Sequence, residues 1–263
     1  QEKELNQFLL HFDTDLRARQ TNDNQADDRD DLHLLGYTSE LYDATRRLTL
    51  GDFFGDFSPY SMSQALRGLQ ASVTTGASQV KALAAFSQEE DEGKQFMRYV
   101  FGGRYERPLF ENSETIRDAK IGINVSDVED DQDSIEARAG LTDSSNQVVS
   151  VNMPAKLWGK TDVETEFAHS WLTARQYAEG SSFNRTVTDE ENGSAIHFKG
   201  TTRFSKKTKW KFDLESVSPR FNTLSGSAVT DRFNLENRLD QKLSQYWSSQ
   251  AGLRFSFDKL NKS

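Results

Sequence analysis

The stretch AIHFKGTTRFSKKTKWKFDLES, residues 195–216, separates into two faces by alternation. Apolar or small residues occupy the even positions from 196 to 204, and polar or charged residues occupy the odd positions between them. After the break SKK the alternation restarts, with apolar residues even and charged residues odd from Lys209 to Glu215. A period of two is that of a β-strand, and two such runs around a three-residue break predict a β-hairpin.

The same alternation recurs along the chain, and no segment of comparable length shows the 3.6-residue period and the caps of a helix. It predicts an all-β protein of about fourteen strands. The expected strands are residues 8–19, 32–41, 46–53, 65–74, 80–87, 95–106, 118–126, 134–142, 147–158, 161–172, 194–204, 208–217, 231–243 and 246–258.

The connections between these segments differ in length. Short ones, such as TTGAS and SKK, are interleaved with longer polar ones, such as FGDFSPYSMSQ at 54–64 and SVSPRFNTLSGSAVTD at 216–231. Short turns at one end of a sheet and long loops at the other predict an antiparallel up-and-down arrangement. The alternation slips between residues 107 and 160, where the connections fit this scheme least well.

Composition excludes several classes of protein. Only 35% of the residues are apolar and the mean hydropathy is -0.74, yet 11% are aromatic, which fits apolar residues placed singly at every second position. A net charge of -9 excludes a nucleic-acid partner, because the phosphate backbone favours a basic surface. The absence of Cys excludes disulfides and thiolate metal sites.

Two environments demand a sheet with one apolar and one charged face. A soluble sandwich packs the apolar face against a second sheet, whereas an outer-membrane barrel turns it to lipid and turns the charged face to a lumen. Soluble strands mostly have about 5 to 6 residues, and a tilted membrane strand needs about 9 to 11. The runs here have mostly eight to thirteen residues, which favours a transmembrane β-barrel. We expect Gly102 and Gly103 to relieve crowding or to mark a bend in its wall.

The charged face of this barrel defines the candidate site. Each cation turned to lipid near the bilayer midplane would cost about 2 to 4 kcal/mol, so the register is fixed with these residues inward. Mixed signs on neighbouring strands favour cross-strand ion pairs. The residues predicted to line the lumen and set ion preference are Lys199, Arg203, Lys209, Lys211, Asp213, Glu215, Glu236, Arg238 and Asp240.

Aromatic residues near the ends of predicted strands are typical of the girdles that meet lipid headgroups. Those predicted to form the girdles are Trp171, Tyr177, Trp210 and Trp247. The alternative is that Trp is present here simply because it favours strands.

Over essentially its whole length the sequence resembles the outer-membrane β-barrels of Gram-negative bacteria, in its alternating hairpins, acidic loops and lack of Cys. Residues 46–73 are also similar to the Leu-Gly-Asp and Arg-Gly strand pattern of fimbrial ushers and other large secretion barrels, with Leu50–Asp52 and Arg67–Gly68 at the matching positions. The resemblance implies a bacterial outer-membrane location. It implies membrane lipid and lipopolysaccharide as partners, with other envelope proteins or further copies of the chain.

We expect residues 1–263 to form a single transmembrane barrel domain. Such barrels usually finish on a strand whose last residue is aromatic, whereas this sequence passes Phe255 and Phe257 and ends DKLNKS. This ending favours the alternative that the chain is a segment of a longer barrel.

Candidate catalytic and metal-binding groups are few. FAHSWL places His169 beside Ser170, but adjacent strand residues face opposite ways and cannot form a base and nucleophile pair. The carboxylates of DVEDDQDSIE, residues 127–136, lack the central Gly and distal Glu of an EF-hand. They indicate a solvated loop or, alternatively, cation bridges to lipopolysaccharide. We expect no enzyme, no cofactor and no metal site.

The leading functional hypothesis is therefore a pore or translocation channel with a charged lumen. The main alternative is a structural barrel that anchors a multi-protein envelope or secretion complex, its lumen plugged by a loop or partner. Two further alternatives are an outer-membrane enzyme with a site at the rim and a soluble β-protein that binds carbohydrate.

Overall fold

The computed structural model describes residues 11–20, 32–88, 94–110, 113–136, 138–178 and 185–258. In the chain so described, no helix is long and apolar enough to cross a membrane. A short 3-10 helix, η1 (Gln132–Ser134), precedes the ninth strand. The strands are β1 (His11–Gln20), β2 (Leu32–Tyr42), β3 (Arg46–Ser58), β4 (Met62–Thr75), β5 (Ser78–Gln88), β6 (Met97–Leu109), β7 (Ile116–Arg117), β8 (Ala119–Asp131), β9 (Thr142–Leu157), β10 (Thr161–Tyr177), β11 (Arg185–Arg203), β12 (Thr208–Val217), β13 (Arg232–Lys242) and β14 (Ser248–Asp258).

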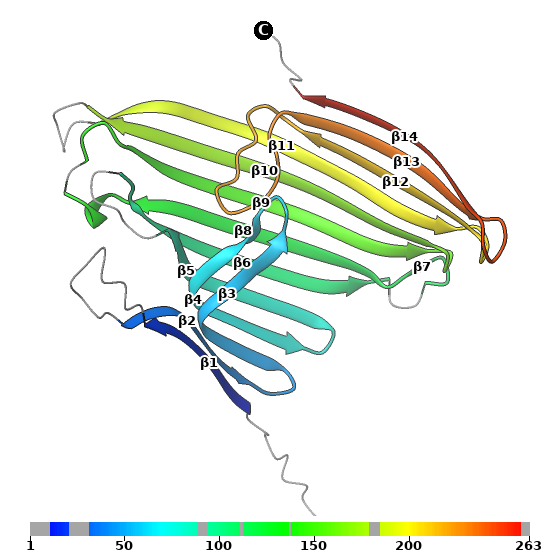
Figure 1. The fold of residues 1–263 in the computed structure, drawn as a ribbon, viewed down its shortest axis with the longest axis horizontal. Coiled ribbons are helices and arrows are strands. Elements are labelled where there is room, and N and C mark those ends of the chain that lie inside the picture. Colours follow the sequence, from blue (N-terminus) through cyan, green and yellow to red (C-terminus); the bar gives the residue numbers. More distant parts are fainter. Residues whose placement is uncertain are drawn as a thin grey trace, which may run out of the picture.

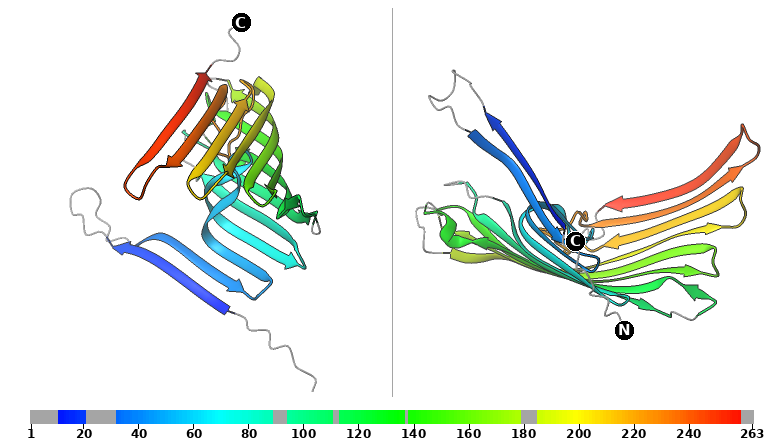
Figure 2. Two further views of the ribbon diagram at one scale, coloured as in Figure 1. Left: turned by 90° about the vertical axis from the view of Figure 1, so that its right-hand side faces the viewer. Right: turned by 90° about the horizontal axis from the view of Figure 1, so that it is seen from below.

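All fourteen strands belong to one sheet, in which every strand except β7 pairs antiparallel with the next strand along the path. The two-residue β7 lies off this path and pairs with β9. Among the described residues β1 and β14 are the two edges, and they do not pair with each other. The sheet curves into an open trough (Figures 1 and 2). The predicted all-β, antiparallel up-and-down fold is confirmed, although the described sheet is not closed.

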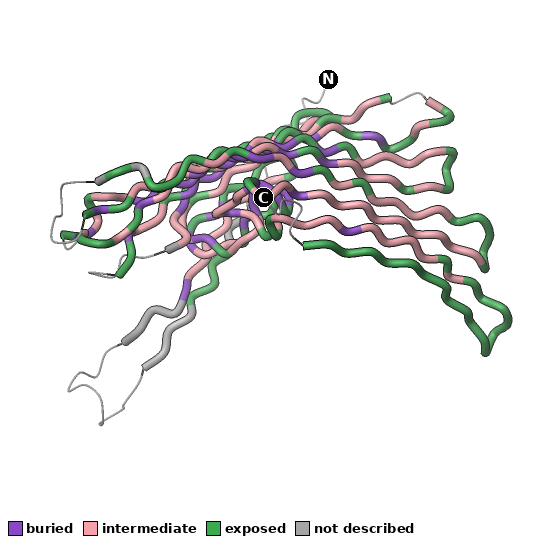
Figure 3. The backbone as a smooth tube through the Cα atoms, turned by 90° about the horizontal axis from the view of Figure 1, so that it is seen from above, coloured by how far each residue is buried: buried purple, intermediate pink, exposed green. Residues whose placement is uncertain are grey.

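The two faces of the sheet differ as the alternation requires. The convex, outer face exposes large apolar side chains at every second position. Examples are Phe101, Val125, Phe167, Phe198 and Phe255. Figure 3 follows the alternation of exposed and less exposed positions along the strands. The whole of β14 is exposed, since no described strand lies beyond it.

One expected strand, residues 134–142, is absent from the sheet. The chain there forms η1 and a turn, and β9 begins only at Thr142. The Asp131 side chain caps η1 by accepting a hydrogen bond from the Asp133 backbone N–H at 3.0 Å. Ile135 is buried against Phe96 and Tyr177. The apolar residues that mimicked a strand therefore pack a small cluster at the end of the sheet.

A second difference concerns residues 54–64, which were expected to form a long polar connection. They are instead strand for most of their length, because β3 runs to Ser58 and β4 begins at Met62. The two strands bend across the concave face of the sheet (Figure 1). Gly51 in β3 has a φ of 106°, which only glycine adopts readily, and a Cβ there would overlap the Tyr37 carbonyl oxygen.

Candidate functional site

The tip of the β3–β4 hairpin, residues 57–62, lies on the concave face. Phe57 and Met62 are buried against Val100 of β6 and Val128 of β8. The Ser58 hydroxyl lies 3.4 Å from that of Ser150 on β9. The hairpin is thus anchored to strands far from its own place in the sheet.

The connection between β12 and β13, residues 218–231, lies on the same face (Figure 1). Phe221 is fully buried in a cluster with Tyr60 and Val217. The Asn146 side chain donates to the Asn222 carbonyl at 3.1 Å and accepts from the Leu224 N–H at 2.9 Å. Buried apolar and polar contacts together fix this loop to β9 and β12.

The hairpin tip and the loop are also joined directly to each other. The backbone N–H groups of Ser227 and Ala228 donate to the Pro59 carbonyl at 2.8 and 3.1 Å. The Ser63 N–H donates to the Ser225 carbonyl at 2.8 Å, and the Ser225 hydroxyl donates to the Ser61 carbonyl. We call residues 57–62 and 218–231 together the inner cap.

Two glycines make room for the inner cap. A Cβ on Gly102 would lie 2.7 Å from Cε2 of Phe57, and a Cβ on Gly193 would overlap the backbone nitrogen of Phe221. A Cβ on Gly103 would meet no atom within 4 Å. The expectation that Gly102 and Gly103 relieve crowding is therefore confirmed for Gly102 only.

The structure places the charged residues of β11, β12 and β13 in rows across the concave face. Lys199 lies opposite Asp213, which in turn lies opposite Glu236. Lys199 Nζ is 3.0 Å from Glu164 Oε2 on β10, and His197 Nε2 is 3.0 Å from Asp213 Oδ1. Opposite charges on adjacent strands thus form cross-strand pairs.

One row reaches the inner cap. The Tyr60 hydroxyl donates to Glu215 Oε1 at 2.9 Å, and Arg232 Nε lies 3.7 Å from Glu215 Oε2. Burial, together with the nearby Glu215 charge, raises the pKa of Tyr60, which keeps this turn residue protonated as a donor. Glu215 therefore connects the cap to the charged rows.

The remaining predicted residues lie nearer the short turns. Arg203 is opposite Lys209, Lys211 is opposite Arg238, and Lys209 is also opposite Asp240. Arg238 Nε pairs with Asp240 Oδ1 at 2.7 Å. Positive charge therefore accumulates toward this end of β11–β13.

Sequence reasoning missed three charged residues beside the cap, Lys81, Arg104 and Glu106. A cavity of about 390 Å³ next to the hairpin tip is lined by Lys81, Arg104, Glu106, Glu164 and Glu166 among others. Arg104 donates to the Phe57 carbonyl and to Asn124 Oδ1 at 3.2 Å, and it pairs with Glu106 at 2.8 Å. The signal available in the sequence was that Lys81, Arg104 and Glu106 occupy the non-apolar parity of their strands.

The four predicted girdle residues occupy different environments. Trp171 and Trp210 are on the outer face, where Trp171 packs on His169 and Trp210 on Phe212, and Trp247 is 73% exposed in the β13–β14 turn. Tyr177 is placed differently from the expectation, because it is buried in the small cluster beyond η1. Trp158, which was missed, is 67% exposed in the β9–β10 turn.

The histidines also have partners that the sequence does not show. His169 and Ser170 point to opposite faces, as expected: His169 Nδ1 lies 2.8 Å from Ser194 Oγ, whereas Ser170 Oγ accepts from the Asn222 N–H. Within the described ranges, no group of three or more His, Asp or Glu residues is arranged to hold a metal ion.

The Asp52 and Arg67 side chains of the usher-like segment meet across β3 and β4. They are opposite each other in the register, and Arg67 Nε lies 2.6 Å from Asp52 Oδ1. Asp52 Oδ2 also accepts from the Tyr37 N–H at 2.9 Å. The segment thus ties β2, β3 and β4 together.

Comparisons with known proteins give one structural likeness. No protein-family model and no curated protein matches the chain. Among solved structures, the chain is similar to OmpTΔL8, a loop L8 deletion mutant of OmpT, an outer membrane protein of Vibrio cholerae. The identity is 11%, the TM-score is 0.45, and the match covers 86% of this chain and 76% of that one. The likeness to ushers stays a prediction.

The expectation that the chain is not an enzyme requires correction. It rested on the lack of a recognisable base and nucleophile in the sequence, whereas separate strands can bring such groups together, as His169 and Ser194 meet on the outer face. We therefore do not keep this exclusion.

The architecture fits the predicted class of outer-membrane β-barrel. The long strands form an antiparallel meander, and the outer face exposes apolar side chains along them. These are the features of a barrel wall that faces lipid. Location in the bacterial outer membrane agrees with them.

Proposed function

We propose that the protein is an outer-membrane channel in which solutes pass along the charged concave face and the inner cap narrows the passage. The observation that supports this most is the position of the cap. It covers the centre of the concave face (Figure 1), while a cavity of about 390 Å³ remains beside it and another of about 570 Å³ lies among the charged rows. Such an arrangement narrows a lumen without filling all of it.

The spacing of outer-face tryptophans supports a membrane-spanning wall. Trp210 is opposite Thr202, which is opposite Thr161, and Trp171 lies ten residues beyond Thr161 on β10. At about 3.3 Å per residue and a tilt of about 40°, the ten residues from Thr161 to Trp171 along β10 correspond to about 25 Å across the membrane. That value matches the height of about 25 Å of the apolar band in such barrels.

The polar lining beside the cap supports a hydrated passage. Lys81 of β5 and Arg104 of β6 line the smaller cavity together with Glu164 and Glu166 of β10. Charged side chains facing a membrane lumen need water or opposite charges, because isolated charges are costly in a medium of low dielectric constant. Both signs are present here, which supports passage of hydrated solutes.

The alternative function is a structural or anchoring barrel with a plugged lumen. The interlocked hydrogen bonds of the cap favour it, because Pro59, Ser61 and Ser225 hold the hairpin and the loop as one unit. A plug of this kind would block the lumen at rest. The two functions differ in what removal of the loop does.

Conductance in planar bilayers separates them. We expect a modest conductance for the unaltered protein and a severalfold larger one when residues 220–228 are replaced by a three-residue Gly-Ser linker. A matched control replaces residues 76–77 of the exposed β4–β5 turn with Gly-Ser and is expected to leave conductance unchanged. If neither the unaltered nor the loop-shortened protein conducts, the anchoring function is favoured.

The lumen-lining role of the predicted residues has its own test. Reversing charge with Lys209→Glu and Lys211→Glu is expected to shift the selectivity of the loop-shortened channel toward cations. The measurement is the reversal potential under a salt gradient. An unchanged reversal potential would show that these residues do not line the passage.

A further inference from the structure

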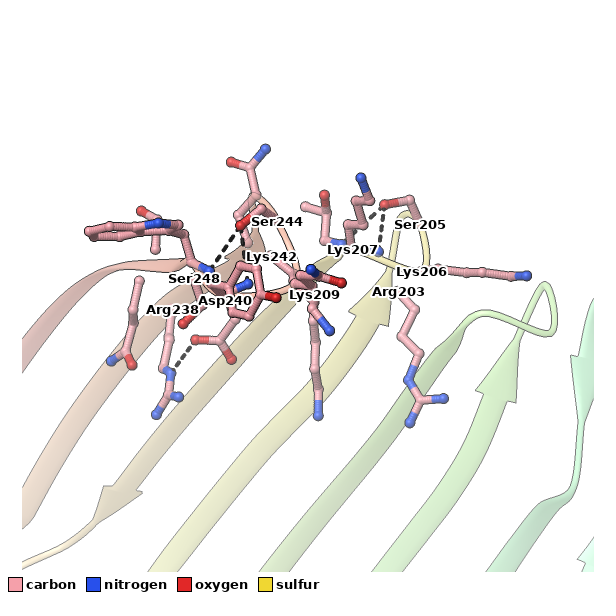
Figure 4. A pocket seen from close by; sticks show the side chains of 17 residues that line it. Arg203, Ser205, Lys206, Lys207, Lys209, Arg238, Asp240, Lys242, Ser244 and Ser248 are labelled. Carbon is pink, nitrogen blue, oxygen red and sulfur yellow. Dashed lines mark hydrogen bonds and ion pairs between the residues drawn. The ribbon is translucent and has the colours of Figure 1, made fainter.

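We infer that the mouth of the channel at the short-turn end binds anionic solutes that carry carboxylate or phosphate groups. The candidate site is an open groove of about 860 Å³ between the β11–β12 and β13–β14 turns (Figure 4). We call it the basic groove, after the cations that line it: Arg203, Lys206, Lys207, Lys209, Arg238 and Lys242. This inference rests on the proposed channel and names the class of solute it would take.

The groove is held by the backbone of both turns. The Lys242 N–H donates to the Lys207 carbonyl at 2.7 Å, which ties one turn to the other. The Ser205 hydroxyl accepts from the Thr208 N–H at 3.1 Å, and the Ser244 hydroxyl accepts from the Trp247 N–H at 3.1 Å. The spacing of the cations is therefore set by hydrogen-bonded turns.

The charge of the groove is one-sided. Asp240 is its single acidic lining residue, and Asp240 is paired with Arg238. The other five cations form no ion pair with any residue that the structure describes. Arg203 and Lys209 are even directly opposite each other in the register, where like charges repel. A bound anion would relieve this repulsion, and the chain as a whole carries a charge of -9.

The direction of the side chains favours a dissolved anion over a lipid headgroup. Arg203 and Lys209 share the parity of Lys199 on the concave face, whereas the neighbouring Trp210 packs with Phe212 on the outer face. In Figure 4 the Arg203, Lys209 and Arg238 side chains extend together away from the turns. These three cations therefore face the passage, whereas Lys206 and Lys207 of the turn extend in other directions.

The rest of the lining suits such a solute. Hydroxyl and amide side chains also line the groove, together with the exposed rings of Tyr246 and Trp247. Hydroxyls and amides donate to oxyanions, and cations bind carboxylate and phosphate through charge-assisted hydrogen bonds. Together the side chains that line the groove offer more hydrogen-bond donors than acceptors, which matches an anionic ligand.

The test is isothermal titration of the full chain in zwitterionic detergent micelles, with pyrophosphate and trigalacturonate as probes and neutral maltotriose as the comparison. We expect both anions to bind and maltotriose not to bind. The double variant Arg203→Gln/Lys209→Gln should weaken anion binding by about tenfold. The matched variant Lys120→Gln/Lys160→Gln removes two cations outside the groove and should keep the affinity.

Each other outcome is decisive. Equal affinity in the two double variants, or no anion binding by the unaltered protein, would overturn the inference. Loss of probe binding in nanodiscs containing phosphatidylglycerol, compared with phosphatidylcholine alone, would assign the groove to a lipid headgroup and overturn the dissolved-anion assignment. Binding is measured without conduction, so a protein that binds anions but does not conduct contradicts only the proposed channel.

Discussion

Charged side chains have different surroundings in two regions of the concave face. One region surrounds the inner cap, and the other is the turn end of β11–β14. Around the cap, several charged groups are partly or fully buried in pairs, such as Arg98 with Asp130 and Arg104 with Glu106. At the turn end, cations accumulate beside a single acid, Asp240. The difference follows from water: buried charges need a partner of opposite sign, whereas exposed charges are solvated and screened. Substitutions in the two regions should therefore differ in cost.

The largest effect is expected where a buried pair is broken. Asp130 is 3% exposed and accepts from Arg98 at 2.7 and 3.0 Å and from the Ser144 N–H at 2.9 Å. Asp130→Asn should lower the free energy of unfolding by about 3 kcal/mol, measured by denaturant titration in detergent. Asp133→Asn, at a carboxylate that is 91% exposed, should cost less than about 0.5 kcal/mol. Equal costs would remove the distinction between buried and exposed charges.

A smaller effect is expected at the glycine beneath the hairpin tip. Gly102→Ala places a Cβ 2.7 Å from Phe57 and should destabilise the fold by about 1 to 3 kcal/mol through overpacking. The adjacent Gly103→Ala has open space and should be neutral or slightly stabilising. The same titration measures both. A neutral Gly102→Ala would mean that the hairpin tip does not rest on β6.

Removing the hydrogen bond between the cap and the charged rows should lower the free energy of unfolding by a smaller amount than Gly102→Ala. Tyr60→Phe removes the 2.9 Å hydrogen bond to Glu215 but keeps the ring in its buried cluster. We expect a loss of about 1 kcal/mol, because Glu215 still has Arg232 as a partner. Thermal unfolding followed by the gel mobility of the folded barrel provides the measurement, and a loss above about 3 kcal/mol would indicate that the whole cap detaches.

The smallest effect on stability is expected in the basic groove. Arg203→Gln/Lys209→Gln removes two like charges that face each other, so stability should change by less than about 0.5 kcal/mol and rise rather than fall. Any gain should shrink in high salt, where the repulsion is screened. Denaturation midpoints at low and high ionic strength test this, and a large loss would show that the groove is a structural element.

The sequence predicted the rows of the concave face but not the cap that covers them. Lys199 and Asp213 could be assigned to one face because strand parity is a local property. The cap could not, because the apolar contacts of Phe57 and Phe221 are made with strands distant in sequence. The strand predicted at residues 134–142 was wrong for a related reason. Alternating apolar residues also suit a local cluster, such as the one that contains Ile135.

The open edges of the sheet have a consequence for how a barrel can be completed. Fourteen strands less β7 leave thirteen consecutive antiparallel strands in the described chain, so β1 and β14 run in the same direction. Joining them directly would create one parallel seam in an otherwise antiparallel wall. An entirely antiparallel barrel instead takes an odd number of additional strands between β14 and β1, consistent with the even strand numbers of bacterial single-chain barrels.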